Sequence, residues 1–467
     1  MHERARNGHG QETATADADF RALCDDVRAA MARLGVPGVA VGVLRDGVIQ
    51  TAGFGITNVE APVAVDDHTL FQIGSITKTF TGTAIMRLVE AGKLALDATV
   101  RTYLPELRLR DEEVAARVTI RHLLSHTGGW LGDYFDDTGL GDDALARIVA
   151  RMVELPQWTP LGQHFSYNNA GFYLAGRIIE VVSGQTYEEA LQTLILDPLG
   201  MAESFFFAND CISRRVAVGH TVGEAGATVA RPWALPRSAH AVGGISASVR
   251  DVLAYARFQL GDGTAPAGTR LLTQDTLTTM QTAATPAGSG AGAVGLTWMV
   301  KELGGLKTVR HTGGTNGQIS VLLLVPARRF ALTIVTNADR GSELHSAVLP
   351  EALRRFCWIE STPSVPPDRT TDALAPYAGS YRGALNDIEI SLAGTTLTLQ
   401  ARPKGGFPKR DTPPGATPPP TRIATYDDDS LIALDPPYTD GRGEFLRDES
   451  GAIAWIRFGS RLARREG

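Results

Sequence analysis

The strands predicted between residues 17 and 336 lie only at the two ends of that segment, and this placement restricts the fold more than any other feature. Near the N-terminus, residues 39–44 and 48–54 are β-rich runs on either side of Asp46-Gly47, a dipeptide typical of a two-residue hairpin. Three further β-rich runs occur only near the other end, at 307–311, 318–325 and 330–336. One antiparallel sheet assembled from both ends accommodates all five runs.

Helical patterns fill the segment between these strands. A first helix is predicted at 17–34, after a disordered tail at 1–15, and a second at 70–92, where apolar side chains recur on one face. From 95 to about 236, helical patterns dominate and are interrupted by proline and glycine. Residues 16–360 are therefore expected to form an α/β domain, with an antiparallel sheet flanked by helices and an inserted all-α subdomain.

The C-terminal part of the chain has a different pattern. A linker is predicted at 361–376, which contains four prolines. Residues 377–467 then contain short alternating runs that are typical of a small barrel or sandwich. We expect a separate C-terminal β-barrel domain.

Charge, hydropathy and cysteine usage argue against several classes of function. The net charge is −6 and no block of like charge occurs, which argues against nucleic-acid binding. The longest clearly apolar run, 321–325, is far shorter than the ~18 residues needed to span a bilayer. Residues 1–20 lack the apolar core of a signal peptide, so we expect no membrane association and a cytoplasmic location. Cys24, Cys211 and Cys357 are expected to be reduced core thiols, and neither a metal ion nor another cofactor is expected.

A serine and a lysine with helical spacing form the first candidate site. Ser75 and Lys78 are three residues apart and share one face of the predicted helix. A lysine can take the proton of a serine hydroxyl when burial or a nearby charge lowers its pKa, whereas an arginine cannot. Only six of the 45 basic residues are lysine, and no other lysine has a serine three residues before it. The alternative is a helix-capping serine followed by a surface lysine.

Tyr167 and Asn169 form the second candidate. Of ten tyrosines, only Tyr167 has an asparagine two residues later. A tyrosinate near lysines can act as a general base, and an asparagine amide can bind both a substrate carbonyl and a lysine. The alternative is a turn at the start of a helix, with an asparagine as its cap.

The third candidate, His-Thr-Gly-Gly, occurs twice, at 126–129 and at 311–314. The first copy follows a short helical pattern and is expected in a loop, whereas the second lies on a predicted strand. Glycines on a strand allow another backbone or a ligand to approach closely. A strand edge beside a nucleophile can also direct an N–H group at a developing oxyanion, so we favour the second copy.

In this order, Ser-x-x-Lys, Tyr-x-Asn and His-x-Gly resemble the motifs of the penicillin-recognising serine hydrolases. This family, of the peptidase S12 type, includes class C β-lactamases, D-alanyl-D-alanine carboxypeptidases, D-aminopeptidases and related esterases. The gaps of 92 residues between Ser75 and Tyr167 and 144 between Tyr167 and His311 are near the family's usual spacing. The resemblance covers roughly residues 36–336, and it implies a β-lactamase/transpeptidase-like fold.

The resemblance also implies how three residues act in catalysis. Ser75 would be the acylated nucleophile, and Lys78 would be its base or electrostatic activator. Tyr167 would be the base that passes a proton to the leaving group. It stays open whether Lys78 or Tyr167 takes the first proton.

The remaining motif residues would bind substrate. Asn169 would orient substrate and the lysine, His311 and Gly313 would line the substrate site, and the N–H group of Gly314 would complete the oxyanion hole together with that of the serine. β-Lactamases and carboxypeptidases generally place a cation at the position of His311. Because the ordinary pKa of histidine is near 6.5, His311 is mostly neutral at pH 7 and a substrate carboxylate loses this anchor.

The C-terminal region carries a weaker resemblance. Residues 377–381, Tyr-Ala-Gly-Ser-Tyr, resemble the opening strand of the lipocalin-like barrel that follows the catalytic domain in several relatives. There the barrel can reach the mouth of the active site; the alternative is a stabilising or oligomerising appendage. Trp130, Tyr134 and Phe135 are candidates for the wall of an apolar acyl pocket or for ordinary packing.

These observations predict a serine acyl hydrolase that forms an acyl-enzyme on Ser75. The His-x-Gly form favours a peptidase or amidase, similar to D-aminopeptidases, acting on a short peptide or another small molecule. Carboxylesterase, β-lactamase and acyl-transfer or peptide-cyclising activities are alternatives, as is homo-oligomerisation. A hypothesis of another class is a non-catalytic penicillin-binding sensor, against which the complete set of motifs argues.

Overall fold

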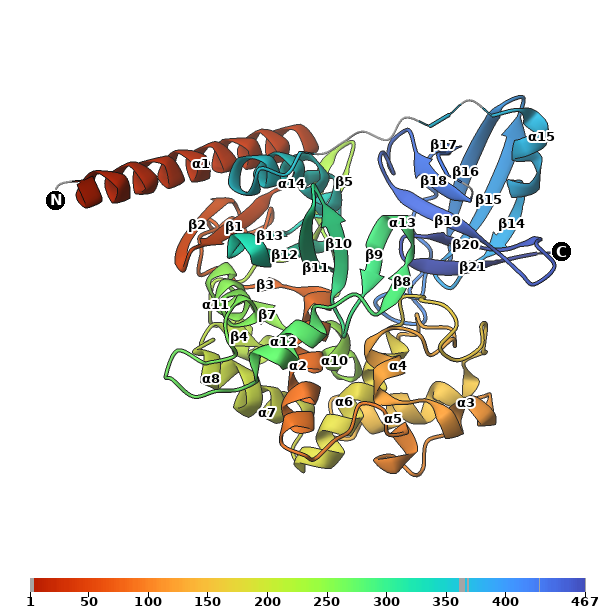
Figure 1. Cartoon of the computed structure of the whole chain (residues 1–467), viewed down its shortest axis with the longest axis horizontal. Helices are drawn as coiled ribbons and strands as arrows, with labels where there is room; N and C mark the ends of the chain where they lie inside the picture. The colour runs from red at the N-terminus through yellow and green to blue at the C-terminus, as the bar shows by residue number, and fades with distance from the viewer. Residues whose placement is uncertain (1–3, 361–365, 368, 428, 467) are drawn as a thin grey trace.

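An eight-stranded antiparallel sheet forms the centre of the α/β domain (Figure 1). In this computed structural model, which describes residues 4–360, 366–367, 369–427 and 429–466, the strand order is β2-β1-β13-β12-β11-β10-β9-β8. The strands are β1 (Gly38–Arg45), β2 (Val48–Gly55), β8 (Thr285–Ala287), β9 (Gly292–Val294), β10 (Met299–Leu303), β11 (Leu306–Thr315), β12 (Gln318–Val325) and β13 (Phe330–Thr336). Because β1 pairs with β13, the sheet joins both ends of the segment, which confirms the prediction.

The first hairpin has the turn that its sequence predicts. Asp46 and Gly47 connect β1 to β2 and have φ values of 50° and 83°. Positive φ at both central residues is the requirement of a type I′ turn, which matches the twist of the two strands.

Helices cover both faces of the sheet. Val41 points to the face that is covered by α1 (Arg4–Leu34) and α14 (Gly341–Cys357), whereas the neighbouring Ala40 points to the face that packs against α2 (Thr77–Glu90) and α11 (Val249–Leu260). This alternation follows from the period of two along a strand. Each face of the sheet therefore has its own hydrophobic core. Helix α2 is largely buried in the middle of the molecule.

Two elements begin elsewhere than the sequence predicts. Helix α1 starts at Arg4 rather than at residue 17, so residues 4–15 of the expected disordered tail are helical, and residues 1–3 lie outside the described residues. The helix expected from residue 70 is interrupted: β3 (Phe71–Gln72) pairs with β7 (Ser246–Ala247), and a 3-10 turn, η1 (Gly74–Ile76), precedes α2.

Helices dominate the region between α2 and the late strands, as expected for residues 95–236, and they continue beyond residue 236. They are α3 (Glu112–Arg117), α4 (Ile120–Leu124), α5 (Ala144–Ala150), α6 (Ala170–Ser183), α7 (Tyr187–Leu191), α8 (Asp197–Leu199), α9 (Ala208–Cys211), α10 (His240–Gly243), α12 (Gln274–Met280) and α13 (Gly288–Ala291). Short strands interrupt them at β4 (Ser204–Phe205), β5 (His220–Gly223) and β6 (Gly226–Val229). None of the helices in the described ranges is long and apolar enough to cross a bilayer.

The C-terminal part is a closed eight-stranded barrel, as expected. Its strands are β14 (Gly379–Arg382), β15 (Asn386–Ala393), β16 (Thr396–Pro403), β17 (Thr421–Thr425), β18 (Ser430–Ala433), β19 (Arg442–Arg447), β20 (Ile453–Phe458) and β21 (Arg461–Arg465). Pairing of β14 with β21 closes the barrel around buried aliphatic side chains such as Leu399, Leu431 and Ile456. Of the predicted linker 361–376, residues 361–365 and 368 lie outside the described residues, and α15 (Thr371–Leu374) begins before its end.

The barrel packs against the α/β domain at several places. Ser289 of α13 donates a hydrogen bond from its Oγ to the carbonyl oxygen of Gly443 on β19, at 2.8 Å. The loop between β16 and β17 forms an ion pair between Lys409 and Asp137, at 2.9 Å. Figure 1 shows that β8 and β9, at the edge of the sheet, and α13 lie next to the barrel. These contacts place the barrel against the side of the α/β domain on which the candidate motifs lie.

Candidate active site

Ser75 and Lys78 lie next to each other where η1 leads into α2. Lys78 Nζ is 2.9 Å from Ser75 Oγ and donates a hydrogen bond to the carbonyl oxygen of Val242, at 2.8 Å. The lysine side chain is fully buried. Burial lowers the pKa of Lys78 well below its usual value; the positive charge of Arg461 adds to this effect and Asp133 opposes it. The environment therefore favours the neutral amine, which can accept the serine proton.

The ring of Tyr167 lies beside this pair. Lys78 Nζ is 5.0 Å from the centre of the Tyr167 ring, and the ring of His126 stacks on Tyr167 with 4.5 Å between the ring centres. The ring of His311 is 6.0 Å from that of Tyr167. Burial raises the pKa of Tyr167, so the phenol keeps its proton at neutral pH. Both copies of His-Thr-Gly-Gly thus reach Tyr167, whereas the sequence pointed to the second copy only.

Asn169 is held by a residue that the sequence did not single out. Its Nδ2 donates a hydrogen bond to Oδ1 of Asp133, at 2.7 Å. Its Oδ1 is buried and has no hydrogen-bond partner among the described residues. Among the described residues, Lys78 donates its hydrogen bonds to Ser75 and Val242 and not to Asn169, so the expected contact between Asn169 and Lys78 is not formed. The unpaired Oδ1 is available to accept a hydrogen bond from a substrate.

Two glycines allow β11 to approach the serine turn. A Cβ atom on Gly313 would lie 2.0 Å from the carbonyl oxygen of Ile73, and one on Gly74 would lie 2.7 Å from the backbone nitrogen of Gly314. Gly74 also has a φ of 51°, which favours glycine. The backbone N–H group of Gly314 therefore lies close to the turn that carries Ser75. An oxyanion hole formed by the N–H groups of Ser75 and Gly314 requires this proximity.

His311 contributes no charge to the site. Its side chain is 2% exposed, and its Nδ1 donates a hydrogen bond to the carbonyl oxygen of Thr312, at 2.7 Å. Burial, assisted by the charge of Lys78, lowers the pKa of His311 to about 3. The imidazole is neutral at physiological pH, so it cannot pair with a substrate carboxylate.

The barrel inserts its last hairpin turn into the site. The carbonyl oxygen of Ser460 accepts a hydrogen bond from the backbone N–H of Tyr167, at 2.8 Å. The guanidinium of Arg461 lies 4.9 Å from the centre of the Tyr167 ring and pairs with Asp133, with 2.5 Å between Nε and Oδ2. Sequence reasoning missed Arg461 and Asp133, because neither belongs to a motif and they are far apart in the chain.

These residues surround a cavity of about 550 Å³. Six of the seven predicted site residues line this cavity: Ser75, Tyr167, Asn169, His311, Gly313 and Gly314. The seventh, Lys78, is buried and does not line it. Phe135 and Phe407, from the α/β domain and the barrel, line it as well, with ring centres 4.9 Å apart. Trp130 and Tyr134 instead pack in the core of the helical region.

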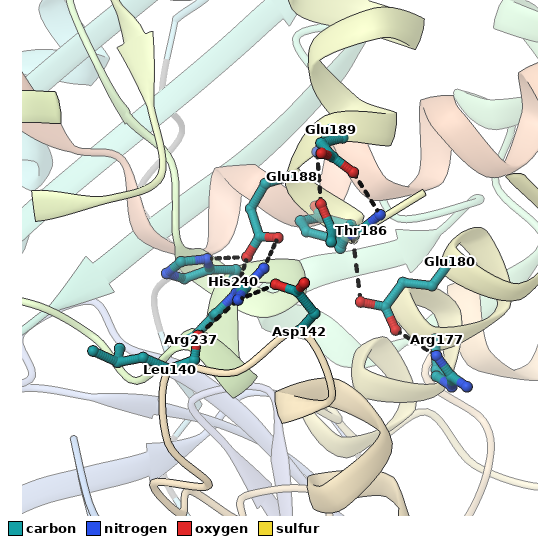
Figure 2. A network of polar contacts seen from close by, with 10 residues as sticks. Leu140, Asp142, Arg177, Glu180, Thr186, Glu188, Glu189, Arg237 and His240 are labelled. Atoms are coloured by element: carbon teal, nitrogen blue, oxygen red, sulfur yellow. Dashed lines mark hydrogen bonds and ion pairs between the residues drawn. The ribbon is translucent and has the colours of Figure 1, made fainter. Parts of the chain in front are cut away.

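A polar network beneath the site fixes α10, which supplies the carbonyl group for Lys78. Glu188 binds Nδ1 of His240 at 2.6 Å and pairs with Arg237 at 3.2 Å, as Figure 2 shows. Arg237 also pairs with Asp142, at 2.7 Å. The network thereby anchors the first residue of the helix that contains Val242.

No metal centre is evident in the part of the chain that the structure describes. There, no three His, Cys, Asp or Glu side chains come together in a group that could hold a metal ion. Cys24, Cys211 and Cys357 are buried and unpaired.

Comparison with known proteins gives the family. The family model described as Beta-lactamase matches residues 24–353. The chain belongs to the beta-lactamase family. Among curated relatives, this family member is 35% identical to "Penicillin-binding protein 4" of Amycolatopsis lactamdurans over 363 residues, which are 74% of this chain and 93% of that protein.

Solved structures extend the likeness beyond the beta-lactamase part of the chain. The crystal structure of SurE matches with a TM-score of 0.75 at 26% identity and covers 97% of this chain and 100% of SurE. An octameric penicillin-binding protein homologue from Pyrococcus abyssi matches with a TM-score of 0.64 at 24% identity, covering 96% and 100%. The second likeness concerns the fold alone. Family and relatives together place the chain among proteins of the β-lactamase and penicillin-binding protein type.

Proposed function

We propose that the protein is an acyl-enzyme serine hydrolase that cleaves amide bonds in small peptides or related amides. The observation that carries this proposal is the 2.9 Å contact between Ser75 Oγ and a fully buried Lys78 Nζ whose pKa is lowered. A serine hydroxyl needs an adjacent base to become a nucleophile, and this amine is the hydrogen-bonded candidate.

The geometry suggests a proton path. Lys78 takes the proton of Ser75 as Oγ bonds to the substrate carbonyl carbon, and the N–H groups of Ser75 and Gly314 stabilise the oxyanion. The phenol of Tyr167, whose pKa is raised by burial, gives its proton to the leaving amine and recovers one from Lys78. Water then attacks the acyl-enzyme, and the same groups reverse their roles.

A neutral His311 and the relatives support an amidase that acts at D-amino acid residues. His311 provides no cation for a carboxylate next to the scissile bond, which distinguishes this site from one built for carboxypeptidase substrates. SurE has also been solved with D-Leu, in a structure that matches this chain at 25% identity. We therefore place D-amino acid amides and D-peptides first among substrates, and esters and β-lactams second.

Covalent labelling tests the nucleophile, and turnover tests the activity. A fluorophosphonate or a β-lactam is expected to give a mass adduct on the intact protein that Ser75→Ala abolishes. Hydrolysis of D-amino acid p-nitroanilides is then compared with that of the L-enantiomers and of p-nitrophenyl esters. Labelling that persists in Ser75→Ala would refute the assignment of the nucleophile. Stable acylation without turnover of any substrate would favour a penicillin-binding sensor.

Acyl transfer is a second candidate, because a larger cavity borders the active-site cavity. The two cavities share wall residues such as Arg310 and Arg461, so an amine could reach the acyl-enzyme from the barrel side. An excess of an amino acid amide would then divert the acyl group from water, giving a new amide product. Unchanged hydrolysis products at high amine concentration would exclude this activity.

A further inference from the structure

A large cavity separates the β10–β11 hairpin from the barrel. Its volume is about 960 Å³, and it adjoins the active-site cavity through shared wall residues, among them Gly290, Arg310 and Arg461. The cavity therefore borders the one in which Ser75 would react. A substrate longer than the 550 Å³ site could extend into it.

The wall of this cavity carries more cations than anions. Six basic side chains line it: Arg33, Lys301, Arg310, Arg442, Arg457 and Arg461. Three acidic side chains line it: Glu343, Asp440 and Glu444. Arg457 is paired with Glu444, and Arg461 with Asp133. Counted together, the lining side chains carry more basic than acidic groups.

Lys301 and Arg310 point to the cavity from the same face of the hairpin. In the β10–β11 register, Met299 is opposite Arg310 and Lys301 is opposite Thr308, so all four side chains lie on one face. Lys301 Nζ donates to the carbonyl oxygen of Ser289, at 3.1 Å, and Arg310 Nη2 donates to that of Gly290, at 3.4 Å. Both cations thus converge on adjacent carbonyl groups of α13.

No carboxylate in the described ranges forms an ion pair with either cation. Burial lowers the pKa of Lys301 to about 8, with further contributions from the charges of Arg310 and Arg442. Burial also lowers the pKa of Arg310. Two like charges that have lost part of their hydration are unfavourable together unless an anion compensates them.

We propose that Lys301 and Arg310 form an anion subsite for a carboxylate of an extended peptide substrate whose reacting carbonyl lies at Ser75. Arg310 is four residues from Gly314 on β11, and a strand rises about 3.4 Å per residue, so the carboxylate lies roughly 14 Å from the oxyanion hole. That span corresponds to a side chain about four residues from the reacting bond. The inference deepens the proposed function and rests on it for the position of the reacting bond.

Binding to the full-length Ser75→Ala variant tests the subsite without turnover. The probes are acetylated pentapeptide amides of otherwise neutral sequence that carry one glutamate, moved one position at a time, each matched with its glutamine analogue. At the favoured position, glutamate is expected to increase affinity by about fivefold or more in calorimetry at low salt. Added salt should reduce this preference.

Matched variants assign the preference to the two cations. Lys301→Gln and Arg310→Gln, each combined with Ser75→Ala, are expected to remove most of it. Lys307→Gln is the control, because Lys307 is an exposed cation on the same hairpin outside the cavity. Equal affinity for glutamate and glutamine at every position would overturn the proposal. A preference that survives in both Lys301→Gln and Arg310→Gln would overturn it as well.

The outcome is separable from failure of the proposed function. Acylation and turnover are measured on the unmodified protein, whereas the glutamate preference is measured on Ser75→Ala. A protein that binds the glutamate peptide preferentially but is not labelled at Ser75 would retain the subsite and lose the hydrolase assignment. Thermal melting of every variant identifies loss of folding; Lys301→Gln alone then carries the test if Arg310→Gln does not fold.

Discussion

Arg461, at the tip of the last barrel hairpin, forms an ion pair with Asp133 of the α/β domain, and the side chain of Asp133 is only 2% exposed. The same carboxylate accepts the hydrogen bond from Asn169. Arg461 lowers the pKa of Lys78, and Asp133 raises it. One ion pair therefore connects the barrel both to the amide of Asn169, which we propose binds substrate, and to the electrostatic environment of Lys78, the proposed base.

Substitutions of this pair should move the acidic limb of the pH–rate profile in opposite directions. Lys78 must be neutral to accept a proton, so kcat/KM falls as the pH drops below its pKa. Asp133→Asn removes a charge that raises this pKa and should shift the limb to lower pH; Arg461→Gln should shift it to higher pH. We also expect kcat to fall by about tenfold in Asp133→Asn, because the hydrogen bond that positions Asn169 loses its charged acceptor. Shifts in the same direction would contradict the assignment.

Lys78→Arg should abolish turnover while the fold is kept. An arginine carries a permanent positive charge and cannot take a proton from Ser75 at ordinary pH. Loss of the base is expected to reduce kcat by on the order of 10³-fold. Stopped-flow measurement of acylation by an activated ester checks this, with circular dichroism as the control for folding. Turnover within tenfold of the unmodified protein would show that another group is the base.

Local patterns predicted much of this fold. The β1–β2 hairpin has an Asp-Gly turn that requires positive φ at both residues, and this requirement acts within two residues. The start of α2 was misplaced, because residues 71–72 form a strand only through pairing with β7, a partner more than 170 residues later. Tertiary pairing of this kind leaves no local trace.

The same distinction applies to the candidate site. Ser75 and Lys78 are recognisable since a helical spacing brings them together within one turn. Arg461 enters the cavity only because the barrel docks on the α/β domain, so no spacing indicates it. His126 was recognisable as a second His-Thr-Gly-Gly copy, but its stacking on Tyr167 depends on how the loop after α4 meets the segment before α6.

Replacing His311 with asparagine should leave the acidic limb of the pH–rate profile unchanged. The pKa of His311 is held at about 3 by burial, so His311 stays neutral across the pH range in which the limb is measured. The asparagine side chain is a smaller, neutral polar substitute, and a reduced kcat with an unshifted limb is expected. The measurement is kcat/KM for a neutral ester across the acidic limb. A limb that disappears in His311→Asn would show that the histidine titrates.

Glu188→Gln should destabilise the protein at neutral pH, because it breaks the network that holds α10. Burial alone would raise the pKa of Glu188, but hydrogen bonds from His240 and Arg237 outweigh it and lower the pKa to about 2. The carboxylate therefore contributes stability that is complete above the usual pKa of 4.5 and is lost as the pH falls toward 2. The difference between the usual pKa of 4.5 and the pKa of about 2 in the folded protein corresponds to about 3 kcal/mol in the free energy of unfolding.

Urea unfolding at pH 7 and at pH 3 measures this contribution. The cost of Glu188→Gln should be large at pH 7 and much smaller at pH 3. Asp142→Asn is the control, since Asp142 pairs with the same Arg237 but is 79% exposed, and it should change stability little. An equal cost of Glu188→Gln at both pH values would show that the charge of Glu188 is not what stabilises α10.

Phe407→Ala should widen the mouth of the active-site cavity and change substrate size selectivity. Phe407, from the barrel, packs edge-on against Phe135 at 4.9 Å, and both line the cavity. Without the Phe407 ring, kcat/KM for a bulky p-nitrophenyl ester should rise about tenfold relative to that for p-nitrophenyl acetate. Arg410→Ala is the matched control: Arg410 is on the same loop, and its one ion pair among the described residues is an exposed pair with Glu154, at 3.5 Å. An unchanged ratio in Phe407→Ala, or the same change in Arg410→Ala, would show that the Phe135–Phe407 contact does not select substrates by size.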